Sequence, residues 1–280
     1  MRGKSLNVLL FVLTVCSTYL IGGLWYSLAL ISILLAHEMG HFVVSRRHGM
    51  PASLPYFLPV PIPPFGTFGA IIKMKGRMSS RKALFDIGVA GPLMGLSLTL
   101  PAIIIGLLLS KAVPLGQTKD HFIHLGDSLL FALVEKAVLG GLPEGYDLCL
   151  HPVAYAGWVG LFVTALNLLP VGQLDGGHIA YALFGRKSKI VFALTITVWM
   201  GISLFFYVGW TLMIVLVLLF GLRHPPPLDD VTPLDLKRKV LGGVVFSLFV
   251  LSFTPIPFTQ APGGLMDILQ MALQGKIVGF

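Results

Sequence analysis

Residues 24–44 read LWYSLALISILLAHEMGHFVV, an apolar stretch of 21 residues that contains three ionisable side chains. At about 1.5 Å of rise per residue, a helix of this length crosses a hydrocarbon core roughly 30 Å thick. An ionisable side chain inside such a span is costly unless it is paired or forms a site. His37, Glu38 and His41 therefore predict a functional site within a membrane helix.

The spacing of these residues indicates a metal site. His37 and His41 are one helical turn apart, so both imidazoles project from one face, whereas Glu38 lies about 100° away around the helix. This is the H-E-x-x-H arrangement, in which two imidazoles bind zinc and the carboxylate acts as general base. The alternative is a chance match, because the pattern fixes only three positions. The apolar surroundings favour zinc, since unpartnered charge is penalised there.

The composition places the chain among membrane proteins. Of its 280 residues, 55% are hydrophobic and 11% are charged, and the mean hydropathy is +0.87. Roughly a quarter of the residues of a soluble domain are charged. The net charge of +8 is therefore interpreted as a topology signal, and nucleic acid is excluded as a partner because no basic run is interleaved with aromatic residues. Cys16 and Cys149 predict neither a disulfide framework nor a thiolate site.

The expected fold is an all-α polytopic bundle of about six to seven transmembrane helices, forming one intramembrane domain over residues 1–280. A signal peptide is the alternative for the first apolar run, but no A-x-A-like cleavage site follows it, so a retained helix is expected. Gly22 and Gly23 predict the turn after it. The expected spans are 6–21, 24–44, 83–109, 152–169, 190–206, 208–222 and 240–254. Seven spans place the N-terminus on the inner side of the membrane and the C-terminus on the outer side. Residues 190–222 could form either one span or a hairpin of two spans.

Residues 49–82 differ in kind from the spans. Six prolines between positions 51 and 64 exclude a regular helix. The stretch is too apolar for a solvated loop. Irregular backbone inside a membrane is stable only where it is buried in protein or lines a water-filled cavity, because its polar groups need hydrogen-bond partners. We expect a re-entrant or interfacial loop near the metal, followed by a short strand around residues 68–75; a proline-rich linker is the alternative. The small residues Gly88, Ala90, Gly91 and Gly95 predict that the third span packs closely on the site helix.

The two longest polar stretches are expected on opposite sides of the membrane. Residues 111–150 contain five acids and three lysines, which predicts the outer side, with an amphipathic helix at 128–139. Residues 223–239 are rich in proline and predict a cytoplasmic linker.

A catalytic zinc usually has three protein ligands, so a third ligand is expected. Asp175 follows the inner half of the fourth span, and the distribution of basic residues places it on the same side as His37. Pro170 and the two glycines after Asp175 predict a broken helix there. The alternatives are that Asp175 is only a helix N-cap, or that His178 is a ligand or an outer partner. Asn167 is interpreted as an interhelical hydrogen-bonding residue or an oxyanion donor.

HEMGH (37–41), AGPLMG (90–95) and NLLPVGQLDGG (167–177), in this order along the chain, resemble the site-2 protease family of intramembrane zinc metalloproteases. The resemblance implies that one Zn²⁺ per chain is bound by His37, His41 and Asp175. It also implies that Glu38 is the base and that Asn167 steadies the substrate. The chain is most similar to the branch without a PDZ insertion that includes plastid and cyanobacterial members, and a cystathionine-synthase-like domain is not expected either.

The expected activity is hydrolysis of a peptide bond in or near the transmembrane segment of a single-span membrane protein. A bacterial cytoplasmic membrane is the expected location, with a plastid membrane as the alternative. Two rival functions remain: a membrane carrier of metal ions and a catalytically inactive scaffold. The lack of a second histidine pair argues against the carrier, and the complete set of catalytic residue types argues against the scaffold. The sequence does not reveal the oligomeric state.

Overall fold

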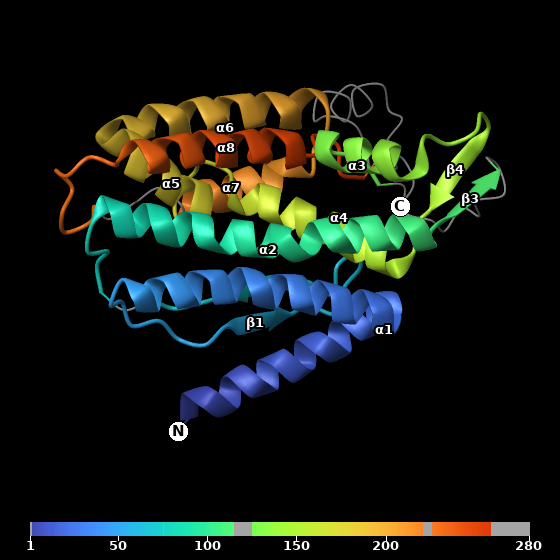
Figure 1. Cartoon of the computed structure of the whole chain (residues 1–280), viewed down its shortest axis with the longest axis horizontal. Coiled ribbons are helices and arrows are strands. Elements are labelled where there is room, and N and C mark those ends of the chain that lie inside the picture. The colour runs from blue at the N-terminus through green and yellow to red at the C-terminus, as the bar shows by residue number, and fades with distance from the viewer. Residues whose placement is uncertain (1, 75, 115–124, 221–225, 259–280) are drawn as a thin grey trace, which may run out of the picture.

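The computed structural model describes residues 2–74, 76–114, 125–220 and 226–258, and most of these residues are helical (Figure 1). Parts of the predicted outer loop and linker, and the tail from residue 259, lie outside the described residues. The helices are α1 (Arg2–Arg47), α2 (Arg81–Leu109), α3 (Leu129–Leu139), α4 (Pro152–Asn167), α5 (Asp175–Phe184), the 3-10 turn η1 (Gly185–Lys187), α6 (Ser188–Phe205), α7 (Trp210–Phe220) and α8 (Leu236–Ser252). The strands are β1 (Tyr56–Pro59), β2 (Thr67–Ile71), β3 (Lys111–Pro114) and β4 (Tyr146–Cys149).

Helix α1 consists of two helical halves that meet at Gly23. The φ angle of Gly23 is 75°, a left-handed conformation that glycine adopts without steric cost. The halves fold back on each other, as Figure 1 shows, and the Thr18 and Ser27 hydroxyls are 2.8 Å apart across the bend. The turn predicted at the two glycines is therefore present, and the second half carries the H-E-x-x-H residues.

The number of membrane crossings is not confirmed. Within the described residues, three helical stretches are long and apolar enough to span a membrane: 5–47, 81–109 and 175–205. Helix α4 and residues 210–219 of α7 are apolar but shorter. Residues 190–222, whose division was uncertain, contain two helices, because α6 ends at Phe205 and α7 begins at Trp210. The chain is a mostly helical membrane protein, and the count of six to seven spans stays a prediction.

The proline-rich segment forms a β-hairpin that packs against α1 (Figure 1). Strands β1 and β2 are antiparallel, with Tyr56 opposite Ile71 and an irregular register near Pro59. The sequence predicted only the second strand; β1 was missed because its flanking prolines resemble a loop. Side chains from three helical segments fix the turn: the hydroxyls of Ser17, Tyr26 and Tyr155 donate to backbone carbonyls of residues 64–66 at 2.7–2.8 Å.

The end of the molecule at the right of Figure 1 carries the predicted amphipathic helix. Helix α3 begins after Ser128, whose hydroxyl accepts from the Phe131 N–H at 3.2 Å, and it ends at Gly140 in a left-handed conformation. Strands β3 and β4 form a second two-stranded antiparallel sheet at this end (Figure 1).

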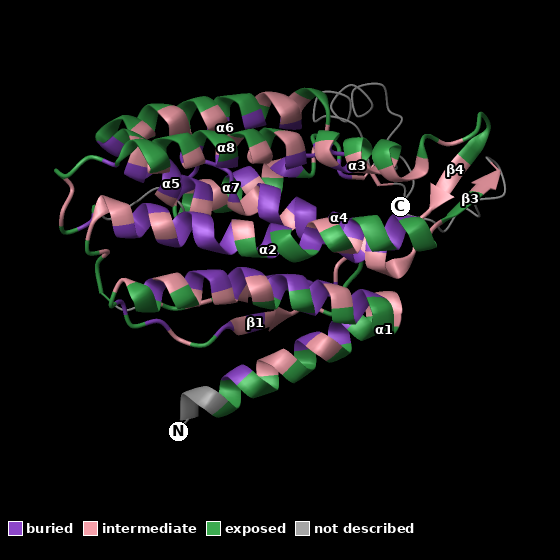
Figure 2. Ribbon diagram, in the orientation of Figure 1, coloured by how far each residue is buried: buried purple, intermediate pink, exposed green. Residues whose placement is uncertain are grey.

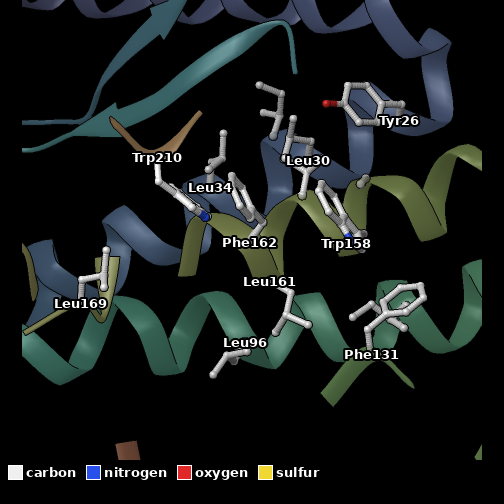
Figure 3. Close-up of a cluster of buried hydrophobic side chains, with 14 of the residues drawn as sticks. Tyr26, Leu30, Leu34, Leu96, Phe131, Trp158, Leu161, Phe162, Leu169 and Trp210 are labelled. Carbon is white, nitrogen blue, oxygen red and sulfur yellow. The ribbon is translucent and has the colours of Figure 1, made fainter. Parts of the chain in front are cut away.

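The buried residues lie between the helices, and the outer helix faces expose apolar side chains (Figure 2). The main cluster contains Leu30 and Leu34 of α1, Leu96 of α2, and the rings of Trp158 and Phe162 on α4 (Figure 3). A smaller cluster joins α2, α5 and α8. Exposed leucine, valine and phenylalanine side chains on the outer faces fit a lipid environment.

Candidate metal centre

The structure brings His37, His41 and Asp175 together from two helices far apart in the sequence. The Nε2 atoms of the two histidines are 3.2 Å apart, and each lies 3.2 Å from Oδ2 of Asp175. Ligand atoms placed tetrahedrally at about 2.0–2.1 Å from a zinc ion are about 3.3 Å from one another. Two imidazoles and one carboxylate are also ligands that zinc accepts. The donor set therefore fits a single metal ion.

The chain positions Asp175 by breaking the helix before it. Helix α4 ends at Asn167, and α5 begins at Asp175 itself. The N-cap residue of α5 is Leu174, which makes no side-chain capping bond. Asp175 is therefore not the helix cap of the alternative interpretation, and its carboxylate is directed to the histidines instead.

Gly176 and Gly177 serve another purpose than the one expected. The helix break predicted at this point is present between Asn167 and Asp175, but the two glycines lie after it, inside α5. A Cβ at Gly176 would be 2.0 Å from the Leu168 carbonyl oxygen, and one at Gly177 would be 2.4 Å from that of Gly172. The glycines allow α5 to fold back closely on the preceding loop, which brings Asp175 to the metal site.

Helix α2 fixes the orientation of His41. The Nδ1–H of His41 donates to the Ile87 carbonyl at 2.8 Å, which leaves Nε2 free to bind a metal. A Cβ on Gly91 would lie 2.0 Å from His41 Nε2, and one on Gly95 would lie 3.3 Å from His37 Cβ. The predicted close packing of the third span on the site helix is therefore present, and glycine is required where the imidazole touches α2.

Glu38 lies beside the metal ligands and is buried, with 6% of its surface exposed. The backbone N–H of Ile72, the residue directly after β2, lies near its carboxylate. The end of the hairpin is thus close to the carboxylate next to His37. Backbone groups such as the Ile72 N–H and the Ile87 carbonyl have no signature in the sequence, so neither was predicted near the site.

Asn167 and His178 differ in their relation to the site. Asn167 is the last residue of α4, and its Nδ2 lies 3.3 Å from Nε2 of His37, so it makes the interhelical contact that was one of its two expected roles. Among the described residues, the metal-binding group comprises His37, His41 and Asp175, without His178. The Cβ of His178 lies 3.4 Å from the position that a Cβ on Gly88 of α2 would take.

The site defines the class of protein: a helical membrane protein with a metal site built from an H-E-x-x-H helix and a distant aspartate. The sequence model of peptidase family M50 matches residues 25–210. The chain therefore belongs to peptidase family M50, the site-2 protease family, and the resemblance seen in the sequence is confirmed.

Proteins similar to this chain are found in plants. The chain is 35% identical over 236 residues to "Probable zinc metalloprotease EGY1, chloroplastic" of Arabidopsis thaliana, which covers 81% of this chain and 42% of the relative. It is 34% identical over 230 residues to "Probable zinc metalloprotease EGY2, chloroplastic" of the same species, covering 81% and 40%. The EGY1 protein of Oryza sativa is 35% identical over 237 residues, covering 81% and 39%. The chain thus spans about two fifths of the length of these relatives, whose plastid location fits the predicted branch of the family.

Proposed function

We propose that this chain is a zinc-dependent intramembrane endopeptidase that hydrolyses a peptide bond in or near the transmembrane segment of a single-span membrane protein. One observation carries the proposal: two imidazoles and a carboxylate from distant helices converge within 4.8 Å, inside an apolar helical protein, with Glu38 next in sequence to His37. Family membership and the names of the relatives support zinc as the metal.

His37, His41 and Asp175 would hold one zinc ion. When bound, zinc supplies Lewis acidity, which polarises a peptide carbonyl and lowers the pKa of water. Three protein ligands leave one position open, as in other catalytic zinc sites. The Ile87 carbonyl, which accepts from His41 Nδ1, keeps the imidazole in the tautomer that binds metal.

Glu38 is the proton carrier. Its carboxylate accepts a proton from the attacking water and delivers it to the nitrogen of the leaving amine. Asn167, with Nδ2 3.3 Å from His37 Nε2, is placed to donate a hydrogen bond to a substrate carbonyl at the same site. The backbone N–H of Ile72 near Glu38 supports a position of the hairpin end beside the reacting groups.

Strand β2 is the proposed substrate guide. A helical substrate hides its carbonyls in hydrogen bonds, so it must unwind before cleavage. Within the described residues, β2 belongs to a two-stranded sheet with β1, which leaves its second edge without a strand partner. Phe68 and Ile71 of β2 expose 76% and 48% of their surfaces. These exposed apolar side chains could pack against an extended apolar segment of the substrate. Edge pairing with β2 would lead the substrate backbone toward Glu38.

The proposed location is a plastid-type membrane, because the relatives are named chloroplastic. The comparisons give no support to the bacterial cytoplasmic membrane that the sequence analysis expected. Single-span proteins and the lipid bilayer are the proposed partners.

Replacing the proton carrier tests the activity. Glu38→Gln keeps the size and hydrogen-bonding capacity of the side chain but cannot accept the proton. In liposomes with a single-span substrate, we expect cleavage to fall about 10²–10⁴-fold while bound zinc, measured by elemental analysis, is unchanged. The matched control is Glu144→Gln, which changes an exposed acid on the loop before β4 and should leave cleavage unaffected.

Full cleavage by Glu38→Gln would contradict the assignment of the base. Zinc flux into sealed vesicles that survives Glu38→Gln, with no cleavage by the parent protein, would instead favour a carrier. Zinc binding with neither flux nor cleavage would favour a scaffold.

A further inference from the structure

Four side chains at the end of the molecule near the metal site join α8 to α1 and α2. The Arg238 guanidinium holds both carboxylate oxygens of Asp86, with Nε 2.7 Å from Oδ1 and Nη2 2.6 Å from Oδ2. His48, just after α1, places Nε2 3.0 Å from Oδ2 of the same carboxylate. Asp235, the N-cap residue of α8, forms an ion pair with the outer side of the guanidinium. Asp86 thus receives partners from two other segments.

The side chains of this cluster are sheltered without being fully buried. The exposed fraction is 22% for Asp86 and 29% for both Arg238 and His48. A bidentate arginine–carboxylate pair is directional as well as strong, because two parallel N–H···O bonds fix the relative orientation of both groups. The pair therefore fixes both the distance and the orientation of the start of α2 relative to α8.

The residue after Asp86 contacts a proposed metal ligand. Ile87 accepts the Nδ1–H of His41 through its backbone carbonyl at 2.8 Å. One turn further along α2, Gly91 lies against the His41 ring, so close that a Cβ there would be 2.0 Å from Nε2. A shift of the start of α2 would change both contacts at once, because the two residues lie on one rigid helix.

We infer that Arg238 is a positioning residue for the metal centre: its bidentate pair with Asp86 fixes α2 so that Ile87 orients His41. This inference rests on the proposed function, because it assumes that His41 binds a metal. The inference adds a residue of α8 to those that support the metal centre. Helix α8 begins at Leu236 and lies outside residues 25–210, which match the family. Arg238 touches neither metal nor substrate, and it acts through Asp86 and Ile87.

The test measures metal retention in the purified full chain. Zinc-loaded protein in detergent is mixed with a chromophoric chelator, and the rate of zinc release is followed for the parent, Arg238→Ala, Arg238→Lys and Asp86→Asn. We expect about tenfold faster release from Arg238→Ala and Asp86→Asn, as for other outer partners of metal ligands. Arg238→Lys keeps the charge but loses the bidentate geometry, so its rate should be intermediate. Combining Arg238→Ala with Asp86→Asn should add little to Asp86→Asn alone, because both changes remove the Arg238–Asp86 pair.

A spectroscopic measurement separates positioning from simple helix anchoring. The visible bands of protein loaded with Co²⁺ alone report the geometry of the ligands. We expect these bands to shift in Arg238→Ala, and to shift by a smaller amount in Arg238→Lys, which keeps the charge but not the bidentate geometry. The control is Lys239→Ala, an exposed cation on the same helix, which should retain zinc and the spectrum like the parent.

Parent-like zinc release and Co²⁺ spectra in Arg238→Ala, with only a lower melting temperature of the metal-free protein, would overturn the inference. If Arg238→Ala does not fold, a parent-like release rate and spectrum in Arg238→Lys would overturn it equally. A parent that retains zinc but cleaves no substrate contradicts the proposed function and leaves this inference standing. A parent that binds no zinc contradicts both.

Discussion

Two regions of this membrane protein are packed in opposite ways. At the metal centre, α1, α2 and α5 approach one another closely at glycine residues. The imidazoles of His37 and His41 occupy the space beside the glycines of α2. Between α4, α7 and the hairpin turn, large aromatic rings fill the space instead: Trp158 stacks on Phe162 at 5.4 Å, and Phe162 lies 5.9 Å from Trp210 (Figure 3).

The difference teaches where the fold tolerates change. Backbone-to-backbone contact has no flexible side chain to move aside, so one added methyl group displaces a helix. At Gly40, for example, a Cβ would lie 2.4 Å from the Ala90 carbonyl oxygen. Aromatic rings share their contacts among many neighbours, so the loss of one group there removes only part of the stabilisation. We therefore expect a single added methyl group to abolish metal binding at the metal centre. A single truncation in the aromatic region should lower the free energy of unfolding only slightly.

The largest expected effect comes from Gly91→Ala. The added methyl group would occupy space 2.0 Å from His41 Nε2, so the imidazole or α2 must move. A misplacement of about 1 Å can lower a rate about 100-fold, and we expect at least that loss of cleavage together with loss of bound zinc. Elemental analysis and the liposome assay measure both.

The matched control for this change is Gly243→Ala in α8, where no atom lies within 4 Å of the added Cβ. It should keep the zinc and the activity of the parent. Normal zinc content in Gly91→Ala would show that the metal region is less tightly constrained than its geometry implies.

A smaller effect is expected from Trp158→Phe in the aromatic region. The change keeps an aromatic ring but removes the indole N–H, which donates to the Gly126 carbonyl at 2.9 Å. We expect the free energy of unfolding to fall by about 1 kcal/mol, while zinc content per folded molecule stays unchanged. Denaturant titration in detergent gives the first quantity, and the exposed Trp25, changed to Phe, is the control. Zinc loss in Trp158→Phe would mean that the two regions are coupled.

The smallest effect is expected at α3, outside the metal centre. Burial, together with the charges of Asp127 and Asp147, raises the pKa of Glu135. Because the folded state holds this proton more tightly, the stabilisation is full below the unfolded pKa and is lost as pH rises through the folded pKa. Glu135→Gln removes the ionisable group, so we expect its melting temperature to exceed that of the parent at pH 7 by at most about 2 °C.

At pH 4 the melting temperatures of Glu135→Gln and the parent should differ less than they do at pH 7. Glu144→Gln, on the exposed loop before β4, serves as the control and should show no such pH-dependent difference. A gain that is equal at both pH values would argue against an altered titration of Glu135.

Much of the candidate site was predictable because its signals are local. The i, i+4 histidines and the carboxylate between them are unusual in an apolar helix, and small residues on α2 predicted a close helix contact. The strand β1 was not predictable, because prolines on both sides of it read as a loop. The glycines after Asp175 were misread as helix breakers, since a sequence cannot show that glycine is needed for close approach to the Leu168 carbonyl.

The sequence by itself determined that this is a helical membrane protein with a metal site, because hydropathy and helical periodicity act over a few turns of one segment. Only the tertiary structure decided which partners complete that site. Asp175 reaches His37 through a fold-back of α5, and Arg238 reaches Asp86 across 152 positions of the chain. These contacts depend on how the helices pack against one another. Packing depends on the side chains of several helices at once, so no single stretch of residues determines it.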